Sequence, residues 1–356
     1  MTIPPPANHP ATRTARPSGF RDSLIACAVL FALAGGQDAA AANKIATVHV
    51  VIKSHFDLGF TDQAVNVFHR YREEMMDKAL RVIDANRDRP AADRFVWTVP
   101  GWPLDAQMLG PEQLPGRRAR IDQAINDGML TAHALAGTTH TEMLDPENLV
   151  RSLGYASAVA RRHGKPLAIS AKMTDVPSHS WILPTLLAHA GVKFLHLGCN
   201  PASQYPRVPP LFWWEGADGS RILCAYTKDY GSDLTPPPDW PGSNYLAMIM
   251  AGDNAGPPEP ADVEKWRAKI REAIPGAQVH FGTLDDFATA VLRENPDLPV
   301  VRGDMPDTWI HGLLSNPQAT RLARHTQAME PALEAMDTQC LLWGLAPPPL
   351  AAPFAE

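Results

Sequence analysis

The stretch IATVHVVIKSHFDLGF, residues 45–60, joins an apolar run to a polar segment that contains a His, an Asp and a Gly. The run is rich in β-branched residues and predicts a buried β-strand. His55 and Asp57 are two residues apart, and side chains with this spacing point to the same face of an extended chain. They follow the strand at its carboxyl end, where parallel α/β folds place their chemistry. The stretch therefore predicts either a functional pair or, more simply, a polar cap on the strand.

The composition is typical of a globular protein. The chain has 356 residues, of which 45% are hydrophobic and 20% charged, and its formal net charge is −6. This length is enough for one large domain or two smaller ones. No stretch is densely basic, so we expect no nucleic-acid partner. The four cysteines do not have the spacing of a metal site.

The first 42 residues have the features of a signal peptide. Three arginines precede the apolar run LIACAVLFALAGG, and small residues follow it. This order is typical of a secretory signal, and the run is too short to span a membrane comfortably. We therefore expect residues 1–42 to be removed on export and the mature protein to be periplasmic or secreted. No transmembrane anchor is expected after removal of the signal.

From residue 45 onward, strand-like segments alternate with amphipathic segments. Strands are expected in residues 45–52, 94–100, 129–135, 166–175, 193–198, 277–282 and 298–303. The segment 211–227 predicts a hairpin around the turn Ala217-Asp218-Gly219. Repeated βα units predict a parallel sheet, either open or closed into an irregular barrel.

Further His and Asp residues follow the expected strands. Asp175 ends the expected strand 166–175, and His311 comes after the strand-like segment VVRG. With His55 and Asp57 they form a set of two imidazoles and two carboxylates that suits Zn²⁺, with Mn²⁺ or Co²⁺ as alternatives. Asp253 lies in a Gly-flanked loop within MIMAGDNAGP. Viewed alone, each of these residues also fits an ordinary role in a cap, loop or turn.

Aromatic and polar residues near these segments are candidates for contacts with a substrate. An aromatic ring offers a flat apolar face for a ligand, although core packing is the more frequent fate of a tryptophan. The predicted substrate contacts are Trp97, Trp102, His140, Glu142 and Trp309.

The order of these motifs resembles the N-terminal domain of glycoside hydrolase family 38, the α-mannosidases. The resemblance covers residues 45–336: His-x-Asp is followed by Asp, then by Gly-Asp-x-x-Gly-Pro, then by His-Gly. The segments GMLTAHALAGTTHTEMLDPENLVRSLGYA and FWWEGADGSRIL are also similar to family segments. The resemblance implies a distorted seven-stranded parallel β/α barrel over residues 43–316. Residues 317–356 would then hold a helix that opens a truncated helical domain, followed by a tail rich in Pro and Ala.

The same resemblance implies a zinc-dependent retaining α-glycosidase, similar to α-mannosidases, with a carbohydrate substrate and one Zn²⁺ per chain. It makes His55, Asp57, Asp175 and His311 the zinc ligands and Asp175 also the nucleophile. Asp253 matches the loop of the general acid/base, with Asp229 and Asp285 as alternatives.

Two departures from the family bear on function. Phe60 stands where the family commonly has Trp, and the family's C-terminal domains do not follow within the 356 residues. Two alternatives therefore stay open: a metal-dependent carbohydrate deacetylase, and a catalytically degenerate barrel that binds carbohydrate.

Overall fold

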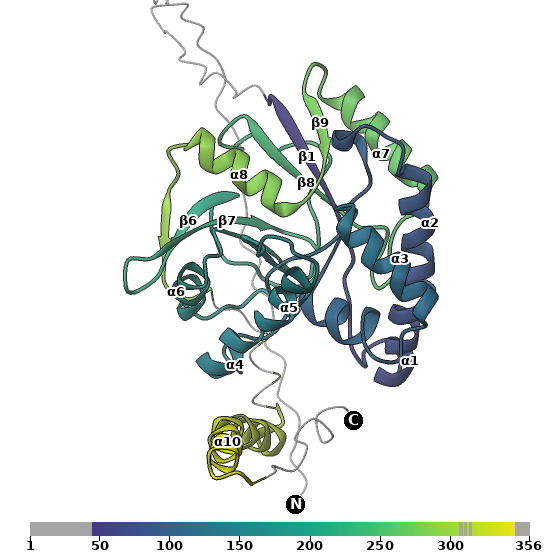
Figure 1. Ribbon diagram of the computed structural model, residues 1–356. Helices are drawn as coiled ribbons and strands as arrows, with labels where there is room; N and C mark the ends of the chain where they lie inside the picture. The colour runs from purple at the N-terminus through teal and green to yellow at the C-terminus, as the bar shows by residue number, and fades with distance from the viewer. Residues whose placement is uncertain (1–44, 306–308, 310–311, 313–314, 346–356) are drawn as a thin grey trace, which may run out of the picture. The chain divides into compact units, whose positions relative to one another are not determined.

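The computed structural model, drawn in Figure 1, describes residues 45–305, 309, 312 and 315–345. The predicted signal peptide, His311 and the end of the predicted tail lie outside the described residues.

The first sheet is parallel throughout and has β1 at its centre. Its order is β3-β2-β1-β8, and β9 also pairs with β1. β1 pairs with β8 from Thr47 to Ile52. It also pairs with β9 from Thr47 to Val50 and with β2 at Ile52 and Lys53. The strands are β1 (Thr47–Lys53), β2 (Trp97–Val99), β3 (Leu130–Ala132), β8 (Asn244–Ile249) and β9 (Gln278–Phe281).

The second sheet contains the predicted hairpin. Its order is β10-β6-β7-β5-β4. β6 and β7 pair in antiparallel fashion, as the turn at Ala217-Asp218-Gly219 predicted, while the other pairs are parallel. The strands are β4 (Ser170–Met173), β5 (Phe194–Gly198), β6 (Leu211–Glu215), β7 (Arg221–Thr227) and β10 (Val300–Arg302).

The parallel α/β fold is confirmed, but a closed seven-stranded barrel is not. A backbone hydrogen bond of 2.9 Å from Ala134 to Ser170 links the end of β3 to the start of β4. No strand pairing joins the two sheets among the described residues. On the other side, the backbone and hydroxyl of Ser232, five residues beyond β7, bond to Leu246 and Met248 of β8. A loop thus takes the edge of β8 that a neighbouring strand would need.

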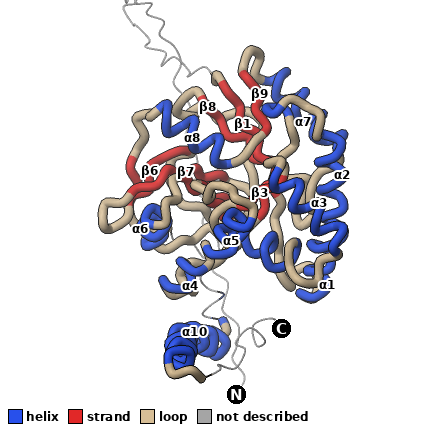
Figure 2. The backbone as a smooth tube through the Cα atoms, viewed as in Figure 1, coloured by secondary structure: helices blue, strands red, loops and turns tan. Residues whose placement is uncertain are grey.

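Helices surround the strands (Figure 2). The α-helices are α1 (Ala64–Arg70), α2 (Met76–Asn86), α3 (Pro115–Asn126), α4 (Pro146–Arg151), α5 (Gly154–Arg162), α6 (Ile182–His189), α7 (Pro260–Ala273), α8 (Leu284–Glu294) and α10 (Pro317–Leu342). Shorter helical segments are the π-helices Tyr71–Met75 and Pro103–Met108 and the 3-10 helix Ala91–Asp93. None of the helices in the described part of the chain is long and apolar enough to cross a membrane.

Local sequence explains several of these boundaries. The Asp145 carboxylate accepts a bond from the Asn148 backbone N–H and caps α4, as its position before Pro146 favours. Gly164 follows α5 with a φ of 60°, the left-handed conformation that commonly ends a helix. α8 has a complete capping box in which Thr283 and Asp286 satisfy each other's backbone N–H groups.

Two apolar clusters hold the sheets in place. The larger one contains buried residues of β1 and β8 together with residues of α2, α7 and α8, and it also includes Phe194 and Leu223 of the second sheet. The smaller cluster joins the second sheet to Leu183 and Leu187 of α6. Because the larger cluster has members from both sheets, it fixes their relative position.

We predict that Ile52→Ala lowers the free energy of unfolding by about 2–5 kcal/mol, the usual cost of emptying a well-packed site. Ile52 is fully buried in β1, between β2 and β8. Urea unfolding followed by circular dichroism measures this cost. Ile182→Ala is the matched control, because Ile182 is 40% exposed. Equal losses in the two variants would contradict a central packing role for β1.

Candidate active site

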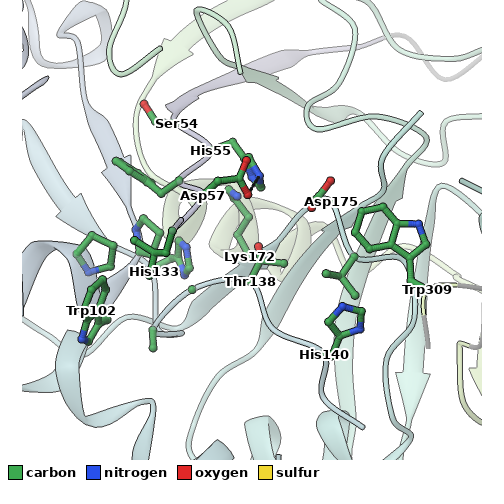
Figure 3. A pocket seen from close by; sticks show the side chains of 17 residues that line it. Ser54, His55, Asp57, Trp102, His133, Thr138, His140, Lys172, Asp175 and Trp309 are labelled. Carbon is green, nitrogen blue, oxygen red and sulfur yellow. Dashed lines mark hydrogen bonds and ion pairs between the residues drawn. The ribbon is translucent and has the colours of Figure 1, made fainter. Parts of the chain in front are cut away.

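A pocket of about 340 Å³ lies at the carboxyl ends of the parallel strands. Its walls come from the segments that follow β1, β2, β3 and β4, with a further residue from the segment after β10 (Figure 3). Six residues predicted from the sequence line it: His55, Asp57, Trp102, His140, Asp175 and Trp309. Segments far apart in sequence therefore meet at the expected edge.

His55 and Asp57 form one polar group with Asp253. His55 is buried, and its Nε2 lies 3.1 Å from Oδ1 of Asp57. Possible ligand atoms of His55, Asp57 and Asp253 all lie within 4.8 Å of one another. One imidazole and two carboxylates are donors that Zn²⁺ accepts, so the residues present fit a metal ion. The group adds Asp253 to the possible ligands, a role that the sequence did not predict for it.

Asn254 positions Asp57 and was missed by sequence reasoning. Its side-chain oxygen accepts from the Asp57 backbone N–H at 2.8 Å, and its amide donates to Asp57 Oδ2 at 2.7 Å. Hydrogen bonds from His55 and Asn254 hold the pKa of the Asp57 carboxyl below its usual value. Asn254 has a φ of 53°, which Asn tolerates better than most residues. The sequence feature that could have indicated this role is the position of Asn254 beside Asp253, in a loop with a glycine on each side.

Asp175 has a strained backbone and an oriented carboxylate. Its φ is 90°, a conformation that residues other than Gly rarely adopt and that is found at functional sites. The Tyr230 hydroxyl donates to Asp175 Oδ1 at 2.5 Å, and the Asn200 amide donates to the same atom at 3.1 Å. Burial and the bond to Asp175 raise the pKa of Tyr230, so its hydroxyl stays protonated as a donor.

Tyr230 and Asn200 were also missed by sequence reasoning. Asn200 lies two residues after β5, and Tyr230 lies three residues after β7. Their position after parallel strands was a usable signal, but an Asn or a Tyr alone does not mark a catalytic segment.

Of the tryptophans predicted to contact the substrate, two line the pocket and one lies in the core. Trp102 and Trp309 line the pocket, and the ring of His140 lies 6.2 Å from that of Trp309, centroid to centroid. Trp97 is a correction: it is fully buried in the core, and its indole N–H donates to Ser54 Oγ at 3.0 Å. All three residues of β2 are buried, so a side chain on either face of this strand lies in the core.

Four carboxylates predicted as site residues or alternatives are not among the lining residues of this pocket: Glu142, Asp229, Asp253 and Asp285. Of these, Asp253 lies beside His55 and Asp57. Glu142 follows His140 by two residues but is not among the lining residues. Asp285 lies in α8, where its carboxylate accepts from the Ile169 backbone N–H at 3.2 Å. Asp229 borders a different, larger cavity next to β7. Of the three acid/base candidates Asp229, Asp253 and Asp285, only Asp253 belongs to the group with His55 and Asp57.

Comparisons with known proteins give a family match and a similar fold. The model of the glycosyl hydrolases family 38 N-terminal domain matches residues 45–240. A search of curated proteins finds no match. Among solved structures, the chain is similar to an alpha-mannosidase from Enterococcus faecalis V583, with a TM-score of 0.59 and 19% identity over 73% of this chain and 30% of that chain.

Two other solved structures are less similar. A protein of glycosyl hydrolase family 38 from Enterococcus faecalis has a TM-score of 0.49 and 16% identity, over 73% of this chain and 29% of that chain. A putative polysaccharide deacetylase from Mycobacterium smegmatis has a TM-score of 0.44 and 12% identity, over 72% and 93%.

These matches differ in how much of each chain they cover. The present chain spans about 30% of the length of the Enterococcus faecalis alpha-mannosidase, and at 19% identity that likeness concerns the fold. The family model, by contrast, matches more than half of the 356 residues. The chain therefore belongs to glycosyl hydrolase family 38, and residues 45–240 match the family's N-terminal domain.

Proposed function

We propose that the protein is an exported, zinc-dependent retaining α-glycosidase that acts on α-mannosides. The observation that carries the proposal is the convergence of His55, Asp57 and Asp253 at the edge of a pocket that also contains Asp175. Family membership supplies the reaction class.

The zinc ligands in this proposal are the four that the family resemblance implies: His55, Asp57, Asp175 and His311. Of these, His55 and Asp57 belong to the group of clustered donor atoms, whereas Asp175 is not part of that group and His311 lies outside the described residues. His55 is 4% exposed and Asp57 is hydrogen-bonded by Asn254, so both ligands are held before a metal ion binds. Zinc bound there would act as a Lewis acid toward the sugar hydroxyls. In this proposal, the ion and the sugar bind at the barrel of parallel strands that the family resemblance implies.

Asp175 is the proposed nucleophile. Its two side-chain hydrogen bonds, from Tyr230 and Asn200, both reach Oδ1, so Oδ2 is the oxygen proposed to attack the anomeric carbon. Attack forms a bond from this oxygen to the anomeric carbon as the glycosidic C–O bond breaks.

Asp253 is the proposed general acid/base. Its side chain is exposed on a loop beside the pair His55 and Asp57, within reach of a departing sugar oxygen. It would donate a proton to that oxygen and then accept one from the water that cleaves the ester.

Export is part of the proposal and rests on the sequence of residues 1–42 alone. Arginines, a short apolar run and small residues follow one another there in the order of a secretory signal.

We predict about one zinc per chain in protein purified after zinc supplementation, and its loss in His55→Ala. Elemental analysis measures the ratio without requiring knowledge of the sugar. His189→Ala is the control, because the His189 side chain is 67% exposed and bonds to Asp218. A folded wild-type protein that binds no zinc, or a His55→Ala variant that keeps it, would contradict the proposed metal site.

We predict that Asn254→Gly weakens zinc binding by about 10- to 100-fold, because Asp57 loses the amide that orients its carboxylate. Glycine keeps the left-handed backbone and removes only the side chain. Asn295→Gly is the matched control, since Asn295 has a φ of 49° at the end of α8. Competition with a zinc chelator measures the affinity, and equal affinities in both variants would rule out this role.

We predict that Asp253→Asn keeps its zinc but hydrolyses an aryl α-mannoside with a poor leaving group about 10²- to 10⁴-fold more slowly. An activated leaving group should suffer less, because it needs no proton. Asp262→Asn, at an exposed acid that pairs with Lys265, is the control. Unchanged rates would make the acid/base assignment wrong, and loss of zinc would make Asp253 a metal ligand.

A further inference from the structure

Four basic side chains lie on the strands beneath the candidate active site. They come from both sheets, and each is at most 3% exposed: Lys53 of β1, His133 after β3, Lys172 of β4 and His196 of β5. Lys172 and His196 are paired residues on adjacent strands. Lys172 and His133 also line the pocket, where they form part of its wall near His55 and Asp57 (Figure 3).

These groups have few partners within the protein. Lys172 Nζ donates to Thr174 Oγ1 at 3.1 Å, although an ammonium can donate three bonds. Lys53 Nζ contacts the sulfur of Met250 at 3.2 Å. Among the described residues, neither ring nitrogen of His133 has a hydrogen-bond partner, and neither lysine belongs to an ion pair.

Burial without a counter-charge is costly for a cation. Burial lowers the pKa of Lys172 to about 7. Burial, and then repulsion by Lys172, lowers the pKa of His133. Lys172 and His133 therefore lie close enough to interact. The charged form of each is disfavoured while no anion lies beside it.

The proposed glycosidase reaction does not use these groups. It needs two carboxylates and a metal ion, and nearby cations disfavour the binding of another cation. An anion placed on Lys172 and His133 would satisfy their free donor capacity and reduce this repulsion.

We propose that Lys172 and His133 form a binding site for the carboxylate of a uronic acid, so that the pocket selects acidic over neutral glycosides. This inference rests on the proposed function, because it names the class of sugar that the same pocket takes. Two nitrogen donors from adjacent segments match the two oxygens of a carboxylate, and charge-assisted bonds of this kind are the stronger ones. The match favours a carboxylate over a phosphate ester, which presents a third oxygen and a larger charge.

The test compares two sugars that differ only at C6. Isothermal titration calorimetry measures the binding of methyl α-D-mannopyranoside and of methyl α-D-mannopyranosiduronate to the purified protein. Both titrations are run with zinc-loaded and with chelator-treated protein. We expect the uronate to bind at least about tenfold more tightly in both states, which is about 1.4 kcal/mol.

Lys172→Met should abolish this preference, because Met fills similar space without a charge. Replacing an unpaired buried cation by an apolar side chain is compatible with folding. Lys265→Met is the matched control, since the Lys265 side chain is 69% exposed. His133→Leu tests the same site independently if Lys172→Met does not fold.

Three outcomes overturn the inference. The first is equal affinity for the two sugars, or no binding of either. The second is a preference for the uronate that survives both Lys172→Met and His133→Leu. The third is a preference found only with zinc and kept in Lys172→Met, which would place the carboxylate on the metal. Binding is measured without turnover and also without zinc. The binding result therefore stands by itself if the protein proves not to hydrolyse mannosides.

Discussion

The parallel pairing of β1 with β8 determines where the candidate site can form. Their register runs from Thr47 opposite Asn244 to Ile52 opposite Ile249, which brings the two carboxyl ends side by side. Asp57 and Asn254 can then exchange two hydrogen bonds across 197 positions of sequence. A slip of one residue would turn the side chains of β1 to the opposite face and separate His55 from the pocket.

Tyr230 connects this half of the site to the half that depends on the second sheet. Its hydroxyl donates to Asp175, and its ring lies 4.9 Å from the ring of His55, centroid to centroid. The left-handed backbone of Asp175 costs about 1–3 kcal/mol in isolation, so surrounding contacts must impose it. Bonds from Asn200 to both the backbone oxygen and the side chain of Asp175 supply part of this constraint. The segments after β5 and β7 therefore help to hold Asp175 in its position and its strained conformation.

Features that depend on local periodicity could be predicted from the sequence. Most strands, the hairpin, and the edge at which His55, Asp57 and Asp175 meet were predicted, because the carboxyl ends of parallel strands share an edge. β8 was not assigned, since a short apolar run after a Pro-rich segment has no diagnostic period. The burial of Trp97 and the support from Asn254 and Tyr230 depend on tertiary packing, which a single sequence does not encode locally. The open edge of β8 likewise depends on tertiary contacts, because the loop at Ser232 occupies it through hydrogen bonds that no sequence pattern predicts.

The buried lysines give the pocket an electrostatic character that its carboxylates alone do not explain. Lys53 and Lys172 lie near a group of donors suited to a cation; burial disfavours the charged form of both lysines, and repulsion by Lys172 further disfavours that of Lys53. A metal ion bound at His55 and Asp57 adds positive charge to the same region, whereas a uronate brings negative charge to it. In the proposed site, metal and acidic sugar therefore reduce each other's electrostatic cost. Because such coupling is reciprocal, a sugar that binds more tightly with the metal present must also hold the metal more tightly. A neutral mannoside lacks this charge, so the same pocket would couple it to the metal through its hydroxyls alone.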